Sequence, residues 1–76
     1  AHHICDWLVP TRDLLLDRGM MGDGVIDLAG LRRAVLAAGY DGPQEVEIFS
    51  AGNWWKRPPE EVIATCLQRW RDCCQP

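Results

Sequence analysis

The sequence lacks any apolar run that approaches the roughly 20 residues of a membrane-spanning helix. It also lacks a basic excess, because 8 Lys and Arg residues stand against 11 Asp and Glu residues and give a formal net charge of -3. We therefore expect binding to neither nucleic acid nor an anionic membrane surface. No charged-then-apolar leader opens the chain either, and we expect a cytoplasmic protein.

Low-complexity stretches and internal repeats are also missing, and the chain is 47% hydrophobic and 25% charged, as ordinary globular proteins are. Its 76 residues allow one small domain at most. The four cysteines, Cys5, Cys66, Cys73 and Cys74, do not form the C-x-x-C pairs typical of zinc sites, and three of them share one amphipathic segment. We expect packed free thiols rather than a disulfide framework.

The stretch over residues 44–50, QEVEIFS, alternates as a β-strand does. The period of two puts Val46 and Ile48 on one face, toward a layer of helices, and Glu45 and Glu47 on the other. In a parallel sheet that is covered by helices, an ionised carboxylate costs several kcal/mol unless it is paired or binds a metal. Glu47, near the end of the strand, is therefore a candidate site residue, and for Glu45 we expect a structural ion pair with Arg or Lys from another strand.

The remaining elements give the order β-α-β-α. A second alternating stretch covers residues 2–6, and helical spacing of apolar residues begins after the N-cap Asp27 and again at Pro59. Residues 7–24 and 51–58 are expected to be long loops, the first with a possible helical turn. Strand, crossover helix and strand predict a parallel pair, and two parallel strands leave open sheet edges. We therefore expect a fragment of a larger α/β barrel or open sheet.

Sites in βα-repeat folds form where strands end and loops begin. His3 and Asp6 of the first strand, Glu47 of the second strand and Arg18 in the long loop have such positions. An imidazole and a carboxylate from neighbouring strands suit a divalent ion such as Mn²⁺, Co²⁺, Zn²⁺ or Mg²⁺. Two ligands do not complete a site, and nothing else in this chain is placed to supply the others.

Three segments resemble one family: residues 3–6 reading HICD, residues 17–27 reading DRGMMGDGVID, and residues 40–49 reading YDGPQEVEIF. Together they are similar to the C-terminal end of the sugar phosphate isomerases and epimerases that have xylose isomerase-like TIM barrels. The resemblance implies that residues 1–76 form the C-terminal quarter of a (β/α)8 barrel. It also implies a metal-dependent isomerase or epimerase of small sugars, polyols or sugar phosphates, inactive when reduced to this chain.

The same resemblance implies roles for four residues. His3 and Glu47 are implied metal ligands, and Glu47 is also implied to move a proton at the carbon next to a carbonyl through an enediolate. Arg18 is implied to contact substrate oxygens. For Asp6 three interpretations stay open: it binds substrate, it holds His3 in one tautomer, or it caps the strand.

Two other functions compete with the isomerase hypothesis. An endonuclease IV-like, metal-dependent phosphodiesterase has the same barrel, but its basic DNA-facing loops are not supported by the net charge of -3. A non-catalytic interaction module, or an oligomer of the chain, is the third possibility. Trp54 and Trp55 are expected either to stack on a sugar ring or to anchor the last helix, and Met20 and Met21 to pack under the long loop.

Overall fold

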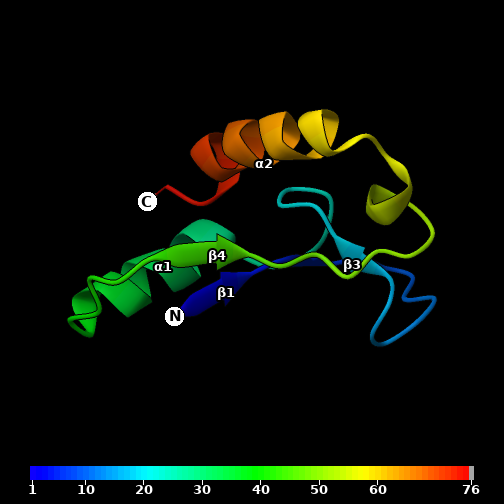
Figure 1. The fold of residues 1–76 in the computed structure, drawn as a ribbon. Helices are drawn as coiled ribbons and strands as arrows, with labels where there is room; N and C mark the ends of the chain where they lie inside the picture. The colour runs from blue at the N-terminus through cyan, green and yellow to red at the C-terminus, as the bar shows by residue number, and fades with distance from the viewer. Residues whose placement is uncertain (76) are drawn as a thin grey trace.

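The computed structural model describes residues 1–75 as a small α/β unit with two helices and short strands. The elements are β1 (His2–Ile4), β2 (Asp6–Trp7), β3 (Arg18–Gly19), α1 (Leu28–Ala37), β4 (Gln44–Val46), a 3₁₀ helix (Trp54–Lys56) and α2 (Pro59–Cys73). Figure 1 shows β1 and β4 side by side near α1, with α2 along the far edge of the molecule. Over the described residues, no helix combines the length and apolar character needed to cross a membrane.

The predicted parallel pair is present, and β1 and β4 pair with His3 opposite Glu45 and Ile4 opposite Val46. The second strand is shorter than predicted, because β4 ends at Val46. One further hydrogen bond, from the Glu47 N–H to the Ile4 carbonyl at 2.9 Å, continues the pairing. β1 itself ends at Ile4, and beyond Glu47 the chain pairs instead with the segment that leads into β3, where the Arg18 N–H donates to the Phe49 carbonyl at 2.8 Å and Asp17 forms an antiparallel bridge with Ser50.

The predicted long loop over residues 7–24 was wrong in part. It contains β3, which pairs antiparallel with β2 so that Trp7 lies opposite Arg18 and Asp6 lies opposite Gly19. A strand of two residues is too short to show the alternation of apolar and polar side chains by which strands are recognised. The sequence therefore gave no signal for this hairpin. The hairpin begins directly after β1. One continuous backbone segment, residues 2–7, therefore pairs first with β4 in parallel and then with β3 in antiparallel orientation.

The Asp6 carboxylate organises the loop that follows the hairpin. It is 1% exposed, and it accepts hydrogen bonds from the backbone N–H groups of Gly22 at 2.9 Å, Gly24 at 3.0 Å and Ile26 at 3.1 Å. A fourth N–H, that of Trp7, donates to the same carboxylate at 2.8 Å. A buried carboxylate is tolerated when such donors replace water, so Asp6 and the loop stabilise one another.

Gly24 is the tightest point of this loop, and its substitution should destabilise the fold. A Cβ there would lie 2.5 Å from Asp6 Oδ1 and closer still to the carbonyl oxygen of Trp7, whereas a Cβ at Gly52 would meet nothing within 4 Å. We expect Gly24→Ala to lower the free energy of unfolding by about 1–3 kcal/mol and Gly52→Ala to change it by less than about 0.5 kcal/mol. Urea unfolding followed by tryptophan fluorescence measures both, and equal stabilities would contradict the close packing.

The predicted limits of α1 are confirmed. The Asp27 side chain caps its first turn by accepting from the Gly30 N–H at 3.1 Å, and Gly39, with φ of +93°, follows its last turn. Glycine suits that left-handed conformation because it has no Cβ. The apolar stripe of α1 is mostly uncovered, since Leu28 is its buried residue and Leu31 is 52% exposed.

The core lies between the strands, the loop and α2. Its buried apolar members are Ile4, Met20, Met21, Leu28, Trp54 and Cys74. The prediction that both methionines pack under the long loop is confirmed, since each is fully buried. Polar contacts tie α2 down as well: Trp70 Nε1 donates to Gln44 Oε1 at 2.7 Å, and Arg69 pairs with Asp23 at 2.7 Å.

All four cysteines are free thiols, as predicted. Burial raises the pKa of the Cys74 thiol to about 11, with the neighbouring Cys73 and Asp6 adding to the shift. Burial also raises the pKa of Cys66. A raised pKa disfavours the reactive thiolate, so these two thiols suit packing rather than chemistry.

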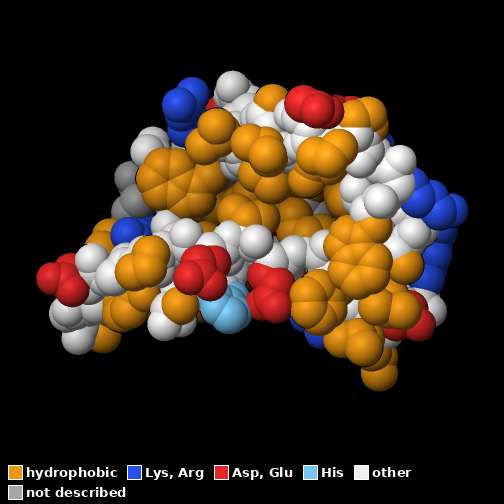
Figure 2. Space-filling model, in the orientation of Figure 1, with side chains coloured by type: hydrophobic (Ala, Val, Ile, Leu, Met, Phe, Trp, Pro, Cys, Tyr) orange, Lys and Arg blue, Asp and Glu red, His pale blue; other side chains and the backbone are white. Residues whose placement is uncertain are grey.

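Apolar side chains also gather on a face that the rest of residues 1–75 leaves open to solvent. Figure 2 shows them between α2 and the strands. A groove there is lined by Val46, Cys66, Leu67 and Trp70, and Val46 is 37% exposed and Leu67 is 54% exposed. Val46 thus faces α2, as the alternation predicts, but the contact leaves much of its surface open.

Candidate functional site

His3 and Glu47 lie in direct contact. His3 Nδ1 is 2.7 Å from Glu47 Oε2, and His3 Nε2 is 3.1 Å from Glu45 Oε2. The parallel register explains both contacts, because His3 lies opposite Glu45, and Glu47 follows two residues later on the same face. Figure 2 shows a histidine flanked by acidic side chains at the edge of the molecule.

The predicted partner of Glu45 was wrong. Its carboxylate pairs with the His3 imidazole, and no Arg or Lys ion pair of Glu45 occurs among residues 1–75. The reason is the register, which places an imidazole directly across from it. The Glu45 side chain is also 56% exposed, so the burial that motivated a cationic partner is missing on this face.

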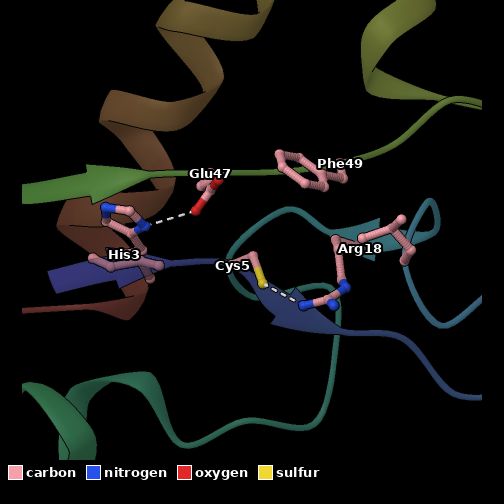
Figure 3. A pocket seen from close by; sticks show the side chains of 7 residues that line it. His3, Cys5, Arg18, Glu47 and Phe49 are labelled. Carbon is pink, nitrogen blue, oxygen red and sulfur yellow. Dashed lines mark hydrogen bonds and ion pairs between the residues drawn. The ribbon is translucent and has the colours of Figure 1, made fainter.

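A cavity of about 270 Å³ joins three of the predicted site residues. His3 comes from β1, Arg18 from β3, and Glu47 from the segment after β4, and all three line it. Cys5, Leu15 and Phe49 complete most of its wall. Figure 3 shows His3 and Glu47 in contact on one side and Arg18 on the other, with Cys5 between them. Segments that are far apart in the sequence thus bring an imidazole, a carboxylate and a guanidinium to one cavity.

Arg18 is held by the hairpin. Its Nε donates to the Leu14 carbonyl at 3.2 Å, and its Nη1 contacts Cys5 Sγ at 3.9 Å. The guanidinium also lies over the ring of Trp7, with its carbon 5.2 Å from the ring centroid, which is within cation–π range. Trp7 and Arg18 are paired residues of β2 and β3, so the strand pairing itself sets this stacking.

Asp6 does not belong to this cavity. Its carboxylate is buried and accepts four backbone N–H groups, so reaching a substrate would leave those groups without a partner. The contacts of His3 are with Glu45 and Glu47, which also removes the tautomer-holding interpretation. Of the three interpretations, substrate binding is thus not supported, and Asp6 stabilises the end of the strand and the loop by accepting backbone N–H groups.

Comparison with known proteins decides the family. The sequence matches the family described as xylose isomerase-like TIM barrel over residues 1–74. The chain belongs to this family. The resemblance drawn from the sequence segments is thereby confirmed, and the family covers isomerases, epimerases and endonuclease IV-like enzymes.

One solved relative extends this comparison. The crystal structure of protein SMc04130 from Sinorhizobium meliloti 1021 is similar to this xylose isomerase-like chain, with 74% sequence identity and a TM-score of 0.97. The match covers 100% of this chain and 28% of that protein. The chain thus spans little more than a quarter of the relative's length. No match was found among the curated proteins.

The donor atoms fit half of a divalent metal site in this xylose isomerase-like chain. An imidazole nitrogen and a carboxylate oxygen from neighbouring strands are donors that such ions accept, and they lie within 2.7 Å of each other. Over residues 1–75, however, no group of three or more His, Cys, Asp or Glu side chains is arranged to hold a metal ion. Further ligands would have to come from outside this chain.

Sequence reasoning did not select Cys5, Phe49 and Leu15 as cavity residues. Cys5 and Phe49 carried a signal, because each follows a predicted site residue by two positions and so shares its face. Leu15 carried none, since it lies in the turn before β3.

The two tryptophans after β4 differ in their surroundings. Trp54 is 8% exposed and belongs to the core, so it fits the anchoring interpretation. Trp55 is 58% exposed and contacts Phe49, with ring centroids 5.7 Å apart. Because Phe49 lines the cavity, Trp55 extends the apolar wall of the site toward solvent.

Proposed function

We propose that this chain is the C-terminal quarter of a (β/α)8 barrel and part of a metal-dependent isomerase or epimerase of small sugars, polyols or sugar phosphates. One observation carries the proposal: His3 of β1 and Glu47, which directly follows the parallel strand β4, meet at 2.7 Å in the wall of a cavity. Parallel strands deliver their ends to one side of a sheet, where barrel enzymes have their sites.

The open surfaces of the chain support the larger barrel. Within the described part, β1 and β4 pair only with each other, so each keeps one free edge. Apolar side chains of β4 and α2, such as Val46, Ile63 and Leu67, are also exposed. Free strand edges and exposed apolar faces need covering, and the greater length of the Sinorhizobium relative is consistent with further barrel elements.

His3 and Glu47 would hold a divalent ion together with ligands from other strands. When bound, such an ion supplies Lewis-acid polarisation of the substrate's carbonyl and hydroxyl oxygens. Glu47 lines the cavity with a carboxylate that is partly open to solvent, so it is placed to take a proton from the carbon next to the carbonyl and to return it. Arg18, across the cavity, would contact substrate oxygens.

The charges around the cavity favour a small polar substrate over DNA. The chain carries a net charge of -3, and among the lining residues Arg18 is the one permanent cation. A surface for a phosphate backbone needs several Lys or Arg residues along its track. The sugar isomerase or epimerase is therefore preferred over the endonuclease IV-like activity.

Removal of His3 tests the metal half of this proposal. In the full-length protein, His3→Ala should weaken divalent-metal affinity by at least roughly 100-fold, because a direct ligand contributes more than the supporting residues around it. His2→Ala is the matched control, since His2 contacts Gln44 and does not line the cavity. Elemental analysis gives metal occupancy, and deuterium incorporation from D₂O gives proton exchange.

Metal occupancy and proton exchange should both be lost in His3→Ala and both be retained in His2→Ala. Full metal occupancy in His3→Ala would contradict the ligand assignment. The unaltered protein could also bind a full complement of metal and yet catalyse no exchange of solvent deuterium into any sugar, oxidised polyol or sugar phosphate. That result would contradict the isomerase activity itself.

A further inference from the structure

The His3 imidazole is held between two carboxylates. Its Nδ1 lies 2.7 Å from Glu47 Oε2, and its Nε2 lies 3.1 Å from Glu45 Oε2. The two ring nitrogens point in different directions, so the two carboxylates lie at different edges of the ring. His3 and Glu47 line the cavity, and Glu45 does not. The carboxylate at Nδ1 thus belongs to the cavity, and the carboxylate at Nε2 lies outside it.

The strand register sets the contact with Glu45. His3 and Glu45 are paired directly across β1 and β4, so their side chains project next to each other from the same face of the sheet. Figure 3 shows the other contact, with the imidazole of His3 turned toward Glu47. Because backbone pairing places both His3 and Glu45, the orientation of the ring follows from the sheet rather than from a flexible loop.

The position of the ring proton decides which nitrogen can bind a metal. A neutral imidazole carries a proton on one nitrogen and a lone pair on the other, and a metal ion takes the lone pair. His3 and Glu47 can share one ion only through Nδ1, because Nδ1 is the nitrogen beside Glu47. The proton must then be on Nε2, where the Glu45 carboxylate is placed to accept a hydrogen bond.

Glu45 is not arranged as a third ligand. Over the described residues 1–75, no group of three or more His, Cys, Asp or Glu side chains could hold a metal ion. Glu45 contacts the ring nitrogen that points away from Glu47, so it does not converge with Nδ1 and Glu47 on one point. Its contact with the site is therefore made through the imidazole.

We propose that Glu45 is a positioning residue for the metal site, because its hydrogen bond from Nε2 keeps the Nδ1 lone pair of His3 directed toward an ion shared with Glu47. This inference rests on the proposed function, which assigns the ion to His3 and Glu47. A carboxylate behind a metal-bound histidine fixes the tautomer, orients the ring and makes the bound nitrogen a better donor. The tautomer-holding role that was open for Asp6 is thus assigned to Glu45.

Metal affinity tests the proposal without any turnover. Mn²⁺ and Zn²⁺ are titrated into the full-length protein, and isothermal titration calorimetry gives the dissociation constant of each ion. Glu45→Ala should weaken the affinity about 10- to 100-fold, the usual effect of losing such a supporting partner. Glu45→Gln should weaken it by less than about 10-fold, because the amide oxygen can still accept a hydrogen bond from Nε2.

Gln44→Ala is the matched control. Gln44 is the neighbouring residue of β4, and it makes the corresponding cross-strand contact with His2. It does not line the cavity, but its side chain accepts a hydrogen bond from Trp70 at 2.7 Å. Gln44→Ala should therefore lower the stability and leave the metal affinity unchanged. Urea unfolding of both variants separates a loss of metal affinity from a general loss of stability.

Two further measurements show whether Glu45 acts through His3. In a His3→Ala background, Glu45→Ala should change the remaining Mn²⁺ affinity by less than about 2-fold, because the residue it acts on is gone. In the Zn²⁺-bound protein, NMR spectroscopy of the ring nitrogens should show Nδ1 bound to the ion and Nε2 protonated. Coordination through Nε2, unchanged metal affinity in Glu45→Ala, or an undiminished effect of Glu45→Ala in the His3→Ala background would each overturn the proposal.

The two proposals fail in different ways. Proton exchange together with a metal affinity that is insensitive to Glu45→Ala refutes the positioning role and leaves the isomerase activity standing. A metal affinity that depends on Glu45 and His3, without proton exchange into any substrate of the proposed class, refutes the isomerase activity and leaves the positioning role standing. Binding of neither Mn²⁺ nor Zn²⁺ by the unaltered protein refutes the metal site, and both proposals with it.

Discussion

Glu47→Gln in the full-length protein is expected to slow proton exchange at the substrate carbon by about 10²- to 10⁴-fold. The amide keeps the size of the side chain but cannot accept the proton that a carboxylate accepts. It also weakens the contact with His3 Nδ1, which lies 2.7 Å from the carboxylate oxygen. Deuterium incorporation from D₂O, followed by NMR spectroscopy, measures this change directly.

Glu45→Gln is the matched control for this substitution. Glu45 is on the same strand face and contacts the other nitrogen of His3, but it does not line the cavity. We expect the proton-exchange rate of Glu45→Gln to stay within about 10-fold of the rate of the unaltered protein, because Glu45 would act on the reaction only through its contact with His3. Equal losses in both variants would show that Glu47 supports the site rather than moving the proton.

Asp6→Ala is expected to lower the free energy of unfolding by about 3–5 kcal/mol. The change removes the acceptor of four backbone N–H groups at a position that is 1% exposed. Those groups then remain buried without a partner, and that cost is larger than the loss of the hydrogen bonds alone. Urea unfolding and hydrogen exchange of the Gly22, Gly24 and Ile26 amides measure the effect.

Asp13→Ala gives the exposed counterpart. Asp13 also accepts backbone N–H groups, from Leu15 and Leu16, and these two bonds lower the pKa of its carboxyl. Because Asp13 is exposed, water replaces the lost acceptor and the loss of stability should be much smaller. If both variants lost the same stability, the loop around Asp6 would have to be hydrated rather than closed.

Much of the fold was predictable from local chemistry. The alternation around Ile4 and Val46 predicted two strands, the helix between them predicted that they pair in parallel, and Asp27 and Gly39 predicted the limits of α1. Such signals are visible because each depends on a few neighbouring residues. The β2–β3 hairpin was not predictable in this way, because its pairing of Trp7 with Arg18 joins strands of two residues each across the chain.

Part of the candidate site could also be predicted from the sequence. Alternation alone placed Glu47 at a strand end, and the contact with His3 follows from the parallel register. Arg18 came from the family resemblance, since nothing local distinguishes it from a solvated loop base. The sequence could not decide between the interpretations of Asp6, because a carboxylate at a strand end gives the same pattern whether it faces a substrate or accepts backbone N–H groups.

The continuity of β1 with β2 has one more consequence. A single uninterrupted piece of backbone, residues 3–7, carries the imidazole at one extremity and the aromatic platform of the guanidinium at the other. The separation of His3 from the Trp7 ring that lies beneath Arg18 is therefore set within this one segment. An insertion or deletion within residues 3–7 would move the imidazole and the guanidinium relative to one another even if every other element of the chain stayed in place.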